Sequence, residues 1–99
     1  NGNMNGIKYK RYAVTKNFAK GTNDAITIDI PWSKIVSIQG TLRYGANLHA
    51  LPTSPVGGSG TYNEGMLAQL VITSSNVIQL WVTTAWTSTT LTVVVGYTD

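Results

Sequence analysis

Alternating hydrophobic and polar residues mark the clearest predicted strand of the chain, residues 25–30. Three isoleucines alternate there with polar residues, which places one face of a strand in a core and the other in water. Pro31 cannot donate to a strand ladder and is expected to end this strand. The Gly-Thr-Asn-Asp sequence of residues 21–24 predicts a turn before it.

Five further segments are predicted to be strands, with a hairpin turn at residues 74–76 and another at residues 85–89. Gly40 is expected to be a bulge or a point of close approach. Residues 64–71 also allow one short turn of amphipathic helix in place of a strand. The five segments are Ile7–Phe18, Ile35–Tyr44, Met66–Thr73, Val77–Thr84 and Thr90–Tyr97.

The alternation also predicts which side chains face the core. The inward sets are Val36, Ile38, Leu42 and Tyr44; Ile78, Leu80 and Val82; and Leu91, Val93, Val95 and Tyr97. Val77, Trp81 and Val94 are left facing outward. A second apolar face on a small domain indicates a contact with other chains, so we expect these three residues to lie in an oligomer interface.

Six to seven short strands predict an all-β fold, a small antiparallel β-sandwich that is jelly-roll-like. The composition agrees, because Thr, Val and Ile, which favour strands, number 31 of the 99 residues. We expect residues 1–6 to be a flexible lead from a preceding domain and residues 7–99 to form a single sandwich domain. Residues 45–64, with two prolines and four glycines, predict one long functional or disordered loop.

The sequence offers little for catalysis. Only 11% of the residues are charged, there is no cysteine, and His49 is the one histidine. The four acidic residues show no pairing that would serve a glycosidase, and His49 has no companion at metal-ligand spacing. We therefore expect no enzyme activity, no metal and no cofactor. No apolar run approaches the roughly 20 residues of a membrane span, so no membrane insertion is expected either.

The sequence offers more residues that are suited to ligand binding. Aromatic rings at loops and strand ends can stack on sugar rings, and amide, imidazole and guanidinium groups can bond sugar hydroxyls. The alternative is that each ring closes one end of the core. The candidate ligand-binding residues are Trp32, Arg43, Asn47, His49, Tyr62 and Trp86.

Five of the seven basic residues fall in the first twenty positions. Lysines on an edge strand discourage pairing with other sheets, which is one explanation of this cluster. A patch for an anionic sugar, a lipid headgroup or a nucleic acid is the other.

Several short motifs occur in an order that resembles a known group of proteins. They are Ile-Thr-Ile-Asp-Ile-Pro-Trp at residues 26–32, the strand 35–42, Thr-Ser-Ser-Asn at 73–76 and Val-Val-Val-Gly-Tyr at 93–97. The chain resembles the C-terminal receptor-binding head domains of tailed-phage tail fibres and tailspikes, including their H-type-lectin-like sandwiches. That resemblance implies a homotrimer on the virion, outside the cell, that binds a host surface polysaccharide or lipopolysaccharide.

Two other functions fit the sequence. One is a purely structural module for trimerisation or virion decoration. The other is a nucleic-acid-binding β-barrel that uses the basic and aromatic residues 8–12. The second is disfavoured because basic residues do not recur on later strands to follow a nucleic-acid backbone.

Overall fold

The computed structural model describes residues 6–52 and 68–99 of the chain. Within them the backbone forms seven strands and one short 3₁₀ helix, with no α-helix. The strands are β1 (Lys8–Phe18), β2 (Gly21–Thr27), β3 (Ile35–Tyr44), β4 (Asn47–Ala50), β5 (Ala68–Ile72), β6 (Val77–Val82) and β7 (Trp86–Tyr97), and the 3₁₀ helix η1 is Trp32–Lys34.

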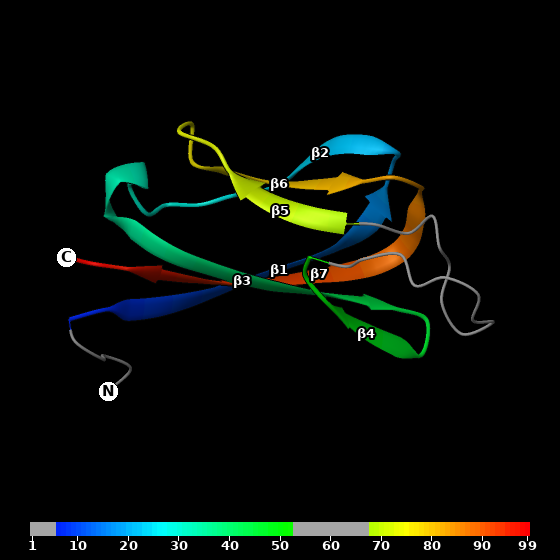
Figure 1. The fold of residues 1–99 in the computed structure, drawn as a ribbon, viewed down its shortest axis with the longest axis horizontal. Coiled ribbons are helices and arrows are strands. Elements are labelled where there is room, and N and C mark those ends of the chain that lie inside the picture. Colours follow the sequence, from blue (N-terminus) through cyan, green and yellow to red (C-terminus); the bar gives the residue numbers. More distant parts are fainter. Residues whose placement is uncertain (1–5, 53–67) are drawn as a thin grey trace.

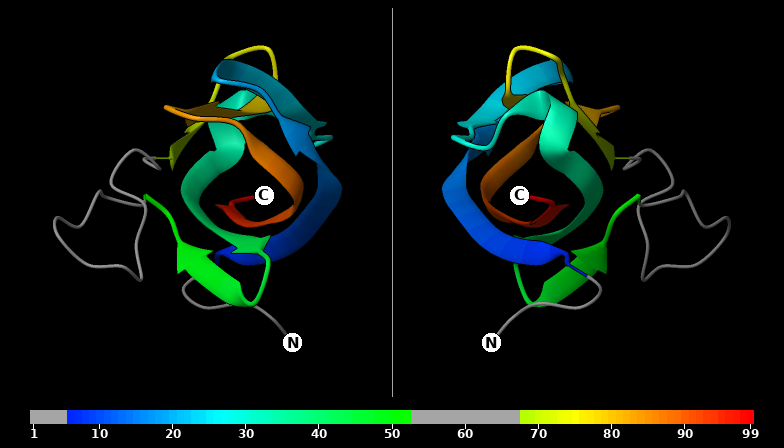
Figure 2. Two further views of the ribbon diagram at one scale, coloured as in Figure 1. Left: turned by 90° about the vertical axis from the view of Figure 1, so that its right-hand side faces the viewer. Right: turned by 90° about the vertical axis from the view of Figure 1, so that its left-hand side faces the viewer.

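Two antiparallel sheets face one another as a sandwich (Figure 1). The larger sheet has the order β1-β7-β3-β4, and the smaller has the order β2-β6-β5. Seen along the long axis, the larger sheet curls beneath the smaller one, with β1 along one side and β3 along the other (Figure 2). The predicted antiparallel sandwich of six to seven strands is confirmed. No helix in the described residues is long and apolar enough to span a bilayer.

The core lies between the two sheets and takes every second residue of β6 and β7. Six of the seven side chains predicted to face inward on these strands are fully buried. Each such burial contributes about 1.5–3 kcal/mol, so these strands supply the centre of the core. The buried residues are Ile78, Leu80, Val82, Leu91, Val93 and Val95, and Tyr97 is half-buried.

One residue predicted to face inward on β3 points the other way. Val36 is 52% exposed, because the pairing of β3 with β7 shifts between Ile35 and Ser37. Such a bulge inserts one extra residue and reverses the alternation beyond it. The other members of the predicted set, Ile38, Leu42 and Tyr44, do pack in or against the core.

The expected close approach at Gly40 is confirmed. A Cβ atom at this position would overlap the Leu70 side chain from β5 and lie 3.2 Å from Cδ1 of Leu51. Gly40 therefore lets the two sheets come together beside the end of β4.

Several predicted strand limits are wrong. β2 is Gly21–Thr27 rather than 25–30, so it ends three residues before the position next to Pro31. It begins at Gly21 because the turn before it lies at residues 19–20, where the Asn23 side chain bonds both the N–H and the carbonyl of Ala19. The predicted loop 45–64 contains a strand, β4, at 47–50. β7 begins at Trp86, within the predicted turn 85–89. Residues 53–67, which include part of that loop and the start of the predicted strand 66–73, lie outside the described residues; residues 68–72 form a strand.

The three residues predicted to form one interface face outward on two different sheets. Val77 and Trp81 lie on β6, with side chains on the outer surface of the three-stranded sheet, whereas Val94 lies on the outer surface of the four-stranded sheet. These surfaces are on opposite sides of the sandwich. The expectation that the three residues are exposed together is therefore wrong, because alternation tells which way a residue points but not to which sheet it belongs.

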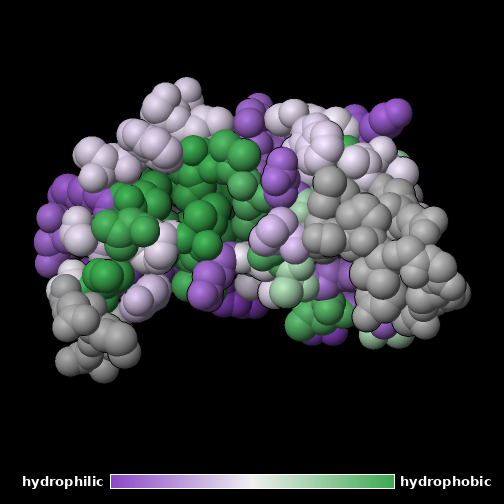
Figure 3. Space-filling model, viewed as in Figure 1, coloured by the Kyte–Doolittle hydropathy of each residue, from purple (hydrophilic) through white to green (hydrophobic). Residues whose placement is uncertain are grey.

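The two lateral edges of the sandwich differ in chemistry. β1, which carries three of the lysines, is an edge strand of the larger sheet, as one explanation of the basic cluster expects. On the other edge, β3 and β5 lie side by side, and apolar side chains gather at the surface there (Figure 3). Among them Val36 and Val71 are about half exposed, while Ile38, Leu51 and Leu70 are partly buried.

Truncating the most buried aromatic ring tests this description of the core. Trp86 is 0% exposed, so Trp86→Ala is expected to lower the free energy of unfolding by about 3–5 kcal/mol in a urea titration. Its indole N–H has no hydrogen-bond partner among the described residues, so Trp86→Phe should retain most of the stability. An unchanged unfolding midpoint for Trp86→Ala would show that the ring is not in the core.

Candidate functional site

The β3–β4 hairpin carries three of the predicted ligand-binding residues, but it does not bring them to one face. Arg43 pairs with Leu48, whereas Leu42 pairs with His49 and Tyr44 pairs with Asn47. Paired residues share a face and neighbouring residues alternate. Arg43 therefore points to the outer surface of the larger sheet, and Asn47 and His49 lie on the inner side of the hairpin.

Trp86 was expected as an accessible stacking ring, and that expectation is wrong. Its ring is buried beneath the hairpin, in edge-to-face contact with Tyr44 at 5.3 Å and with His49 at 5.2 Å between ring centroids. The alternative, that the ring closes one end of the core, describes Trp86 instead. His49 is half-buried in this cluster, and Tyr62 lies outside the described residues.

The short helix η1, which Trp32 begins, lies at the other end of the sandwich from the β3–β4 turn (Figure 1). None of the three residues of η1 is buried, and the Trp32 side chain is 47% exposed. The turn is fixed by the Lys34 N–H, which donates to the Pro31 carbonyl at 3.0 Å. Trp32 therefore does not join Arg43, Asn47 and His49 in a single site.

A cleft of about 240 Å³ opens beside η1, and we name it the η1 cleft. It gathers residues from the start of the chain, the segment after β2, and the C-terminal end. The C-terminal end is held to η1 by the Thr98 N–H, which donates to the Lys34 carbonyl at 2.9 Å. The cleft is lined by Lys10, Asp29, Ile30, Pro31, Lys34, Tyr97, Thr98 and Asp99.

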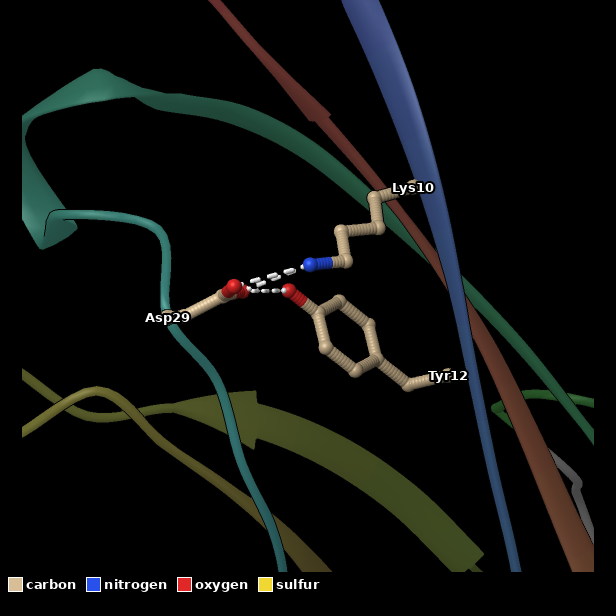
Figure 4. Close-up of polar contacts among 3 residues, drawn as sticks. All are labelled: Lys10, Tyr12 and Asp29. Carbon is tan, nitrogen blue, oxygen red and sulfur yellow. Dashed lines mark hydrogen bonds and ion pairs between the residues drawn. The ribbon is translucent and has the colours of Figure 1, made fainter.

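Asp29 is the polar centre of one wall of this cleft (Figure 4). Lys10 Nζ lies 2.8 and 3.0 Å from its two carboxylate oxygens, and the Tyr12 hydroxyl donates to Oδ1 at 2.6 Å. Ile28 and Ile30 on either side are buried, which turns Asp29 outward toward β1. The three polar groups join the segment after β2 to the edge of the larger sheet.

These contacts fix the protonation states of the wall. The hydrogen bonds from Lys10 and then Tyr12 lower the pKa of Asp29 to about 2, and the bond to Asp29 raises the pKa of Lys10. Burial, followed by the hydrogen bond to Asp29, raises the pKa of Tyr12. At neutral pH the wall therefore holds a carboxylate, an ammonium group and a neutral phenol.

The remaining charges of the cleft are distributed unevenly. Lys8 pairs with Asp99, and that hydrogen bond raises the pKa of Lys8. The Lys34 side chain makes no ion pair or hydrogen bond with any described residue. Lys34 is therefore the cation of the cleft that stays available, two residues from the exposed ring of Trp32.

Asp29 has a lowered pKa and is held by two donors, so it is a poor proton acceptor near neutral pH. Within the described residues, no group of three or more histidine, cysteine and acidic side chains is placed to hold a metal ion. The cleft presents hydroxyl, carboxylate and ammonium groups, and the exposed Trp32 ring belongs to η1 next to it. This combination suits reversible binding of a polar ligand.

Sequence reasoning missed this cleft. None of the predicted site residues lines it, although Trp32 lies next to the lining residue Pro31, at the start of η1. Lys10 and Asp29 are 19 positions apart in the chain. The one available signal was Asp29 itself, the carboxylate between two isoleucines of the alternating segment. A comparison with protein-family models, with curated proteins and with solved structures finds no match to this chain.

The Asp29 contacts predict a pH-dependent contribution to stability. Because its pKa is lowered from 3.8 to about 2, the contribution is present above pH 4 and lost as the pH falls toward 2. The stability difference between the wild type and Asp29→Asn should therefore shrink over this window in urea titrations at stepped pH. Tyr12→Phe, which keeps the ion pair, should show a smaller difference with the same pH dependence. A difference that persists unchanged to pH 2 would contradict this assignment.

Proposed function

We propose that this chain is a non-catalytic attachment domain that binds a cell-surface glycan in the η1 cleft. The observation that carries the proposal is the exposed ring of Trp32 beside a cleft of polar groups. A tryptophan at the surface loses contact with the core, so half-exposure of so large an apolar ring favours a binding role.

The cleft and the Trp32 ring next to it together have the parts that a sugar ring requires. The flat face of Trp32 can stack against the apolar C–H face of a pyranose, as aromatic platforms do with ring ligands. Lys34 offers a free ammonium donor, while Asp29 and the Thr98 hydroxyl offer acceptors. A shallow site of this kind selects a ligand by the positions of its hydroxyls.

The wider setting that we propose is the tip of a phage tail fibre or tailspike, on the virion and outside the cell. Support comes from the sequence resemblance, from the small sandwich fold and from a surface whose polarity rests on Thr, Ser and Asn. In that setting the ligand is a host polysaccharide or lipopolysaccharide. A nucleic-acid site on β1 is less well supported, because Lys8 and Lys10 are each paired with a carboxylate and so are less available for phosphates.

Removing the stacking ring tests the proposed site. Trp32→Ala is expected to weaken binding to the recognised surface polysaccharide more than tenfold, since a central aromatic contact is worth about 2 kcal/mol or more. Lys34→Gln is expected to weaken it less. Binding is measured by surface plasmon resonance on immobilised host polysaccharide, and cell adsorption is measured in parallel.

Leu48→Ala supplies the matched control, because Leu48 is an exposed apolar side chain on β4. The β3–β4 turn lies at the opposite end of the sandwich from η1 (Figure 1). All three variants should keep the wild-type unfolding midpoint, since exposed substitutions change stability by only about 0.5 kcal/mol. Normal binding by Trp32→Ala would exclude the η1 cleft as the glycan site.

A structural assembly module is the second candidate function, and the apolar edge between β3 and β5 favours it. Residues 35–39 of β3 pair only with β7 among the described residues, which leaves their other edge open. This stretch carries no charged residue, and an edge without charge is unprotected against pairing with another chain. We propose that this edge, rather than Val77, Trp81 and Val94, joins the copies of a homotrimer.

Charge placed on this edge should separate the copies. The wild type is expected to sediment at three times the 10.6 kDa mass of one chain, and the variant Val36→Lys at the mass of one. Val77→Lys, the same change on the outer surface of the smaller sheet, should leave the trimer intact. A monomeric wild type at high micromolar concentration would refute the assembly, and dissociation by Val77→Lys alone would move the interface to that other surface.

A further inference from the structure

The outer surface of the four-stranded sheet carries cross-strand rows of side chains in which polar residues lie beside small or apolar ones. Thr92 of β7 pairs with Ala13 on β1 and with Thr41 on β3, and Thr41 pairs in turn with Ala50 on β4. These residues point away from the core because their neighbours Leu91 and Val93 are buried. Two further rows flank this one: Arg11, Val94 and Gln39 on one side, and Thr15, Thr90, Arg43 and Leu48 on the other.

A groove of about 370 Å³ lies over the first two of these rows, and we name it the sheet groove. Its polar lining on this surface consists of Gln39, Thr41 and Thr92, and Val94 adds an apolar patch. Ala50 and Leu51, from the end of β4, also line it. The groove thus presents two hydroxyls and an amide at the surface of a rigid sheet.

An arginine stands on each side of the groove. Arg11 is the cross-strand neighbour of Val94, and Arg43 lies two residues beyond Thr41 on the same face. Both side chains are exposed, and neither makes an ion pair or a hydrogen bond with any described residue. Both guanidinium groups are therefore available to a ligand.

No carboxylate among the described residues balances these cations on the same surface. Asp24 belongs to β2 and bonds Gln79 on the smaller sheet. Asp29 is paired with Lys10, and Asp99 with Lys8, at the η1 end. The groove therefore lies in a positive potential, since two unopposed charges on a surface this poor in charge dominate its local field.

The positions of the two arginines indicate the size of the ligand. Arg11 and Arg43 are separated by two strand spacings and by four residues along the strands, which is roughly 16 Å from the geometry of a sheet. A single carboxylate or sulfate cannot reach both. An extended polymer with acidic groups at intervals can, because each guanidinium binds one carboxylate or sulfate bidentately.

The residues that line the groove favour an acidic polysaccharide over a single-stranded nucleic acid as its ligand. Single-stranded nucleic acids are held by aromatic rings that stack on successive bases, and the groove contains no aromatic residue. Sugar hydroxyls are bonded by hydroxyl and amide groups such as those of Thr41, Thr92 and Gln39. We propose that the sheet groove binds a segment of an acidic polysaccharide, with Arg11 and Arg43 on its acidic groups. This site is separate from the η1 cleft and does not depend on the function proposed for it.

Oligogalacturonate of defined length is a suitable probe, with a neutral oligoglucan of equal length for comparison. Calorimetric titration of the whole chain should show binding of the uronate, weaker at higher salt, and none of the neutral glucan at this groove. Arg11→Gln and Arg43→Gln should each weaken uronate binding about tenfold, as loss of a charge-assisted hydrogen bond does, and the double variant should abolish it.

Lys20→Gln is the matched control, because it removes one exposed cation from the turn between β1 and β2. It should leave uronate binding unchanged, as should Trp32→Ala, which affects only the η1 cleft. Equal losses with Lys20→Gln would overturn the proposal, since binding would then follow net charge alone. Tighter binding of oligothymidylate than of the uronate, lost with the same two arginines, would assign the groove to nucleic acid instead.

Discussion

Strand β7 pairs with β1 on one side and with β3 on the other, and the rest of the structure is arranged around this double pairing. Its inward residues, Leu91, Val93 and Val95, meet the buried face of the smaller sheet. Its outward residues Thr92 and Val94 form the centre of the sheet groove. Its last residue, Tyr97, lines the η1 cleft, and Thr98, which follows it, donates a hydrogen bond to Lys34 of η1. One long strand near the end of the chain therefore contributes to the core and to both candidate sites.

The alternation of hydrophobic and polar residues made it possible to predict which side chains of a strand face the core. The inward residues of β6 and β7 follow directly from alternation, because a side chain on a strand must point to one face or the other. The ends of the strands and the positions of bulges were harder to predict from the sequence. The reversal at Val36 depends on how β3 pairs with β7, whose residues at this point lie 59 and 62 positions further along the chain. The short strand β4 lies among glycines and prolines that favour a loop. Both features are fixed by tertiary pairing, which overrides local preference.

The candidate sites could be predicted only in part, for the same physical reason. The sequence singled out Trp32 and Arg43 by residue type, and the structure leaves both accessible, but at separate places. The sequence pattern predicted that Trp86 lies in a turn, where its ring would be exposed. In the structure β7 begins at Trp86, and the ring is buried. The partners of Asp29 come from a strand 17 and 19 positions earlier. Proximity of this kind arises from topology, and no local pattern in the sequence records it.

The η1 cleft and the sheet groove are both shallow, and shallow sites give self-association a role in binding. A surface covered with threonine hydroxyls and few charges offers each ligand only a handful of contacts, so a single site binds weakly. Several copies held in fixed geometry raise the apparent affinity for a repeating polymer by about 10²–10⁴-fold without any new contact. A polysaccharide repeats its acidic and neutral groups along its length and can engage several copies together. Self-association through the uncharged β3 edge would therefore supply the avidity that sites of this depth lack.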